Sequence, residues 1–98
     1  MPAIVRDGDP TTTGHGCDAV TTVTGPSGNV FANSIGVERQ GDPTSPHTIL
    51  AGEVCVPHSA VINVGSSNVF TNGIPTARVG DSTDGGAIIS GSSNVYVN

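Results

Sequence analysis

Residues 68–81 read NVFTNGIPTARVGD, and both ends of this stretch recur elsewhere in the chain. Its last four residues are an R-x-G-D box, found at 6–9, 39–42 and 78–81. Its first five residues are an N-V-[FY]-x-N box, found at 29–33, 68–72 and 94–98. The first box holds every basic residue of the protein and the second holds every aromatic residue. Because the scarcest residue types occupy equivalent positions, the sequence indicates a threefold internal repeat.

The spacing between the boxes indicates that the repeat closes on itself. Arg39 is the sixth residue after Asn33, and Arg78 is the sixth residue after Asn72. Counting on from Asn98 through the N-terminus, the sixth residue is Arg6. We therefore predict a closed ring of three units, in which residues 94–98 and 2–6 together form the third β-hairpin.

The predicted secondary structure is almost entirely β. Residues 29–41 and 68–80 are predicted to be full hairpins, and Asn72-Gly73 is a strong turn signal because both residues tolerate positive φ. Residues 10–28, 42–67 and 81–93 are predicted to be connections. No run combines a helical apolar period with good helix formers, and the chain is expected to form one domain, 1–98.

The R-x-G-D box suggests a specific local structure. Its glycine is predicted to leave the strand with a φ that other residues avoid. Its aspartate is predicted to accept hydrogen bonds from the backbone N–H groups that follow. Each arginine is expected to pair with the aspartate of its own or of a neighbouring box.

The composition excludes several partners. The net charge is −5 and lysine is absent, so a nucleic acid is not expected as a partner. No stretch approaches the roughly 20 apolar residues of a membrane span, and the N-terminus does not resemble a secretory signal. Large side chains are few, and a scaffold of this size usually needs a metal, a disulfide or a partner to stabilise it.

The candidate metal ligands lie in the connections. The first connection holds His15 and Cys17, the second holds His47, Cys55 and His58, and the third holds only Asp84. A threefold ring would bring all three connections to one end, where four of these side chains could form a closed structural zinc site. The alternative is that they are ordinary polar loop residues and that Cys17 and Cys55 form a disulfide.

A catalytic zinc is a more specific alternative, but the sequence gives it little support. Glu53 and Asp18 lie close in sequence to candidate ligands and could serve as a general base. There is no H-E-x-x-H motif and no helix to carry one, and no nucleophile motif is present. We therefore expect a protein that is not an enzyme, with a zinc-dependent hydrolase as the alternative function.

The stretch 65–81, GSSNVFTNGIPTARVGD, resembles the signature of the PAAR-repeat family, and Pro75-Thr76-Ala77-Arg78 corresponds to the motif that names it. Residues 14–17 and 91–96 also resemble the family, so the likeness covers essentially the whole chain. Glu38 and Gln40 depart from the family pattern in the first repeat. The resemblance implies a small cone with pseudo-threefold symmetry whose base caps a trimeric β-helical spike, one chain per trimer.

The resemblance also implies one structural zinc near the apex of the cone, held by three histidines and one cysteine. By position, His15, His47 and His58 match the family's histidines. The usual cysteine would lie in the third connection, where this chain has Asp84 instead. Cys55 is therefore the first choice for the fourth ligand, followed by Cys17 and then Asp84.

The resemblance implies a role in puncturing a target-cell envelope during tail contraction. The chain is similar in length to the small spike-tip proteins of contractile-tailed phages, so a phage baseplate is favoured over a type VI secretion spike. We then expect assembly in the bacterial cytoplasm, a final location at the tip of the virion's tail and transient contact with a target membrane. An adaptor that carries an effector is a further alternative, although no additional domain is expected within the 98 residues.

Overall fold

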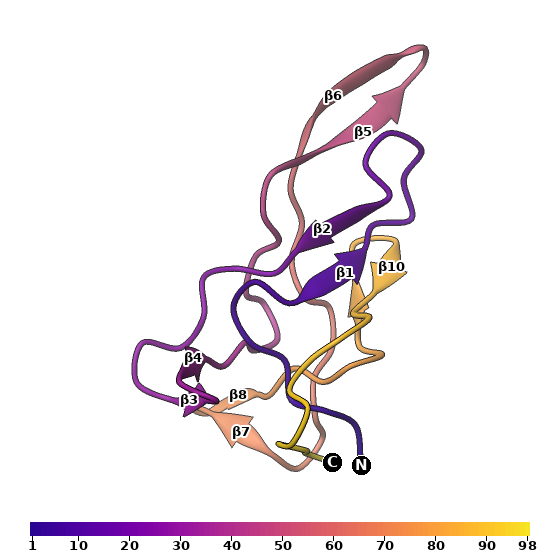
Figure 1. Cartoon of the computed structure of the whole chain (residues 1–98). Helices are drawn as coiled ribbons and strands as arrows, with labels where there is room; N and C mark the ends of the chain where they lie inside the picture. Colours follow the sequence, from indigo (N-terminus) through magenta and orange to yellow (C-terminus); the bar gives the residue numbers. More distant parts are fainter.

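The computed structural model describes residues 1–98 and is built from short antiparallel hairpins without helices (Figure 1). No segment forms a helix that could cross a bilayer. The ten strands pair as five hairpins: β1 (Pro10–Thr12) with β2 (Val20–Thr22), β3 (Phe31–Ala32) with β4 (Ile35–Gly36), β5 (His47–Ala51) with β6 (Val54–His58), β7 (Phe70–Thr71) with β8 (Ile74–Pro75), and β9 (Ser82–Thr83) with β10 (Gly86–Ala87). The prediction of an all-β fold is confirmed.

The hairpins point to two opposite ends of an elongated molecule that measures 41 × 24 × 21 Å (Figure 1). Hairpins β3–β4 and β7–β8 lie at the end that also carries both termini, and we call this end the base. The predicted third hairpin is present there, since Ala3 pairs antiparallel with Tyr96 and the Val97 N–H donates to the Pro2 carbonyl at 2.9 Å. The ring of three units is therefore closed.

The three connections run to the other end, which we call the apex, and they are more regular than the sequence suggested. Each one contains a hairpin rather than a simple loop: β1–β2, β5–β6 and β9–β10. The longest, β5–β6, projects farthest from the body (Figure 1). Its two-residue turn is Gly52-Glu53, and Gly52 has a φ of 67°. Glycine at the first position of a two-residue turn is a recognised hairpin signal, which the prediction of a connection over 42–67 overlooked.

The R-x-G-D boxes fold identically in all three units. Gly8, Gly41 and Gly80 have φ values of 88°, 90° and 94°, as predicted. Each arginine pairs with the aspartate of its own box, and in the second box Arg39 Nε and Nη2 each donate to Asp42 at 2.9 Å. This geometry is a bidentate, charge-assisted pair.

The predicted role of the box aspartate was wrong. It accepts a hydrogen bond from the backbone N–H of the arginine three residues before it, at 2.8 Å in every box, and not from the backbone that follows. The carboxylate therefore closes the turn through the backbone that precedes it, and it also binds the arginine side chain.

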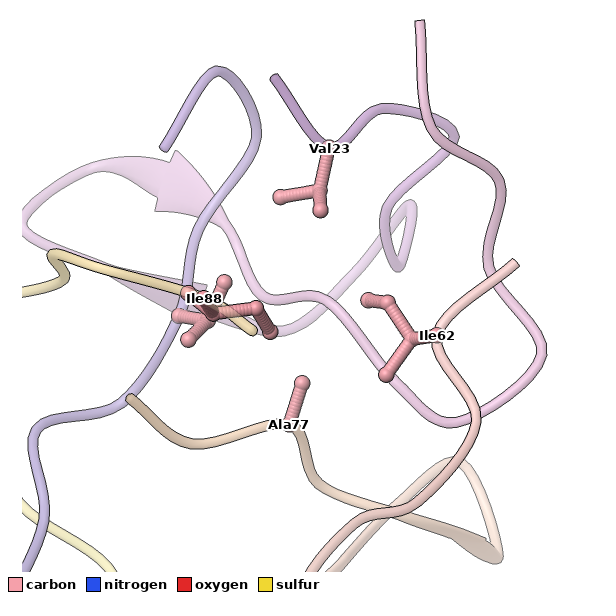
Figure 2. Close-up of a cluster of buried hydrophobic side chains, with 5 residues drawn as sticks. Val23, Ile62, Ala77 and Ile88 are labelled. Carbon is pink, nitrogen blue, oxygen red and sulfur yellow. The ribbon is translucent and has the colours of Figure 1, made fainter. Parts of the chain in front are cut away.

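The core is stacked in layers that take one residue from each unit. In one layer the backbones of Val5, Glu38 and Ala77 form a cyclic set of hydrogen bonds, in which each N–H donates to the carbonyl of the next residue at 3.0–3.2 Å. The adjoining layer holds Val23, Ile62 and Ile88, which pack with Val5 and Ala77 in one buried cluster (Figure 2). Each layer is complete only when all three units are in place.

Glu38 is the exception in this core. It occupies the position that is filled by Val5 and Ala77 in the other units, and its exposed fraction is 0%. Neither carboxyl oxygen has a hydrogen-bond partner. Burial is the main cause that raises the pKa of Glu38 to about 9, and the charges of Asp42 and Asp7 add to it. The carboxyl is therefore protonated near neutral pH.

Candidate metal centre

Three imidazoles and one carboxylate converge at the apex. His47 and His58 are directly opposite each other where β5 and β6 leave the body, His15 lies in the loop between β1 and β2, and Asp84 lies in the turn between β9 and β10. The Nε2 atoms of the three histidines are 2.6, 2.9 and 3.1 Å from Asp84 Oδ2, in the order His15, His47, His58. Each of the three connections thus contributes to the cluster.

The third connection is shaped to bring its carboxylate inward. Asp84 has a φ of 53°, a conformation that aspartate tolerates better than most residues. Glycines let this turn approach the first connection closely: a Cβ on Gly14 would lie 2.5 Å from the Gly85 carbonyl oxygen. A side chain at Gly14 would therefore push the two connections apart.

The hydrogen bond of His47 on its other nitrogen limits what its Nε2 can do. His47 Nδ1 is 2.9 Å from the Ser45 carbonyl oxygen, so Nδ1 must carry the proton and donate it. In the neutral ring, Nε2 is then a bare lone pair that faces the carboxylate oxygen 2.9 Å away. Such an arrangement is repulsive unless the ring is protonated or a cation lies between the two atoms. A backbone carbonyl that fixes the tautomer in this way is the usual outer partner of a metal-bound histidine.

The donor set fits zinc. The four candidate ligand atoms lie within 4.8 Å of one another, and bonds of about 2.0–2.1 Å in a tetrahedron place neighbouring ligand atoms about 3.3 Å apart. The His47 side chain is 2% exposed, those of His15 and Asp84 are 11% exposed, and that of His58 is 30% exposed. Burial alone would raise the pKa of Asp84, but the three imidazoles around the carboxylate outweigh it and the pKa is lowered. The carboxylate is therefore ionised, as a ligand must be.

The two cysteines stand outside this group, because Cys17 and Cys55 form a disulfide. The fourth candidate ligand in the group is Asp84, the third choice, whereas Cys55 and Cys17, the first and second choices, lie outside it. The strand register gives the reason. Side chains alternate between the two faces of a strand, so Cys55 and His58, three residues apart on β6, point to opposite faces. The sequence held this signal, but only once β6 is recognised as a strand.

The opposite end of the molecule presents a different surface. Phe31, Phe70 and Tyr96 occupy equivalent positions in the three units and are 60%, 56% and 50% exposed. Side-chain amides join neighbouring units between them, since Asn33 Nδ2 donates to Asn94 at 2.7 Å and Asn72 Nδ2 donates to Asn29 at 2.8 Å. The base therefore combines a threefold set of exposed aromatic rings with a polar network.

Comparison with protein families identifies the chain. The profile of the PAAR motif family matches residues 8–90, which is most of the sequence. The chain belongs to the PAAR motif family. PAAR proteins are spike-tip proteins of contractile injection systems; they cap a spike, are structural rather than enzymatic as a family, and bind a metal. A search of curated proteins finds no match to the chain.

Proposed function

We propose that this PAAR protein is the tip of a phage tail spike, where one chain caps a trimeric β-helical spike and sharpens it for piercing a target-cell envelope. The observation that carries the proposal is the base, where one chain presents three equivalent hairpin ends around one axis. A single chain with such pseudo-symmetry can match each subunit of a threefold partner without a symmetry mismatch. Proteins rarely expose large apolar side chains in a regular array unless a partner covers them.

The short base hairpins support the same interpretation. Strands at the edge of a sheet leave N–H and C=O groups available for another strand, and partners often extend such sheets. In this role the chain would be found at the baseplate of the virion after assembly in the bacterial cytoplasm. The similarity to small phage spike-tip proteins favours this location over a type VI secretion spike.

We further propose one structural zinc per chain, held by His15, His47, His58 and Asp84. The metal would crosslink the three connections at the apex, where the molecule is too thin to contain a hydrophobic core. Structural zinc can contribute on the order of 10 kcal/mol to folding. Four protein ligands fill a tetrahedral site and leave no position for a substrate, so this donor set disfavours the zinc hydrolase as the alternative.

The capping proposal is tested by mixing the protein with a trimeric β-helical spike encoded in the same genome and measuring the mass of the complex by light scattering. We expect one chain per trimer. The variant Phe31→Ser/Phe70→Ser should weaken the complex at least tenfold, while Leu50→Ser, an equally exposed apolar position near the apex (51%), should not. A complex with three chains per trimer, or equal effects of both variants, would contradict the proposal.

A further inference from the structure

Two crosslinks join the loop between β1 and β2 to the hairpin β5–β6, and neither belongs to the cluster of candidate ligands. The first is the disulfide between Cys17 and Cys55, which lie 38 residues apart in sequence. The second is the carboxylate of Asp18, whose Oδ2 accepts hydrogen bonds from the backbone N–H and the Oγ1 of Thr48, both at 2.7 Å. Both crosslinks act on the hairpin face opposite to the one that carries His47 and His58, because Thr48 and Cys55 alternate with the histidines along their strands.

These crosslinks connect the same two segments that bring the imidazoles together. His15 belongs to the loop, whereas His47 and His58 belong to the hairpin. Beyond His47 and His58 the hairpin projects away from the body (Figure 1), and its outer residues Leu50 and Val54 are 51% and 63% exposed. Little hydrophobic packing therefore fixes the hairpin against the loop. The Asp18 contacts are exposed, so their net contribution is small.

We propose that the Cys17–Cys55 disulfide is a positioning crosslink, which holds His15 against the two histidines of β5–β6 so that the apex is preorganised for the metal. This inference rests on the metal site proposed above. Binding to a site that is already ordered avoids the entropy cost of ordering it at the moment of binding. The metal affinity of this protein is then set by its oxidation state, although no sulfur is a ligand.

The chemistry of the crosslink is an ordinary thiol oxidation. The two thiols lose two protons and two electrons, a sulfur–sulfur bond forms, and an acceptor of the disulfide-exchange class is reduced to two thiols. A reducing cytoplasm favours the open form and an oxidising environment the closed form. The apex therefore has two coupled constraints, the disulfide and the bound metal, and each makes the other less costly to form.

The test compares zinc affinity, by competition with a chromophoric chelator, between the oxidised wild type and Cys17→Ser/Cys55→Ser. We expect both to bind one zinc per chain and the double variant to bind at least tenfold more weakly. Glu53→Gln, at the exposed turn of the same hairpin, is the matched control and should leave the affinity unchanged. Reducing the disulfide of the wild-type protein with a phosphine gives a second measurement without a sequence change. It should reproduce the loss of zinc affinity.

Cobalt(II) in place of zinc reports the ligand set by its absorption. We expect no thiolate-to-cobalt charge-transfer band in either oxidation state. Equal zinc affinity of the oxidised wild type and the double variant would overturn the inference while leaving the metal site intact. A thiolate band that appears on reduction would also overturn it, because sulfur would then be a ligand. An oxidised wild type that binds no zinc would instead overturn the proposed site itself.

Discussion

Replacing Glu38 by methionine is expected to stabilise the protein and to remove a large part of its pH dependence. Glu38 lies in an otherwise apolar position of the core, it is 0% exposed, and its carboxyl oxygens have no partner. Burial, reinforced by the charges of Asp42 and Asp7, raises its pKa from 4.5 to about 9. Between these two pH values the folded chain holds a proton that the unfolded chain has released.

The sign and the size of the effect follow from this difference. The proton stabilises the folded state fully below pH 4.5, and the advantage is lost as the pH rises towards the folded-state pKa of about 9. One pKa unit is worth about 1.4 kcal/mol, so the free energy of unfolding should fall by about 3 kcal/mol between pH 4.5 and pH 7. Methionine has a similar shape and cannot ionise. The variant should therefore gain about 3 kcal/mol at pH 7, which corresponds to a melting temperature higher by roughly 10 °C or more.

The assay is urea unfolding at several pH values from 5 to 9, with a chelator present, for the wild type, Glu38→Met and Glu38→Gln. The candidate metal ligands are unchanged in all three proteins, so any contribution that they make cancels in the differences. The advantage of Glu38→Met over the wild type should grow with pH, and Glu38→Gln should show the same pH trend with a smaller absolute gain, because its amide is also unpartnered. Curves that run parallel at all pH values would refute the reasoning, since they would mean that Glu38 ionises in the folded protein at little cost.

Two further substitutions test the repeated unit, one within an R-x-G-D box and one just before an N-V-[FY]-x-N box. Asp42→Asn removes the charge that holds Arg39, and we expect it to lower the free energy of unfolding by about 1–3 kcal/mol. The control Asp7→Asn, at an exposed position without such a pair, should change the free energy of unfolding by less than about 0.5 kcal/mol. Equal effects of the two variants would argue against the box as a stabilising unit. Ser66→Ala removes the hydroxyl that accepts from the backbone N–H of Val69 at 2.9 Å, and chemical denaturation should show a loss of about 1–2 kcal/mol that the neighbouring exposed Ser67→Ala does not share.

The sequence predicted the features that depend on repetition. The recurrence of the boxes was sufficient to predict the closed ring, the hairpins at the base and the positive φ at Gly8, Gly41 and Gly80. It was also sufficient to predict that the connections would meet at one end (Figure 1). These features are local or follow from symmetry, so they can be predicted from the sequence of one chain without comparison with relatives.

The features that break the repeat were harder to predict. Whether Cys55 or Asp84 completes the cluster depends on the register of β5–β6, which follows from a turn at Gly52-Glu53 that lies outside the repeated boxes. Whether Glu38 is buried depends on which way its side chain points in a core that is assembled from three segments distant in sequence. The first question could have been answered from the local turn signal at Gly52-Glu53. The second is decided by contacts between residues far apart in sequence, which local patterns do not describe.

The cyclic hydrogen bonds among Val5, Glu38 and Ala77 have a consequence for how the chain folds. Each layer takes its residues from all three units, and the bridge between Ala3 and Tyr96 joins two segments that are far apart in sequence. We therefore expect folding to be cooperative, with the core formed only when all three units are present. Long-range pairing of this kind is slow and leaves strand edges unprotected in the meantime, so the unfolded chain is expected to aggregate more readily than the folded protein.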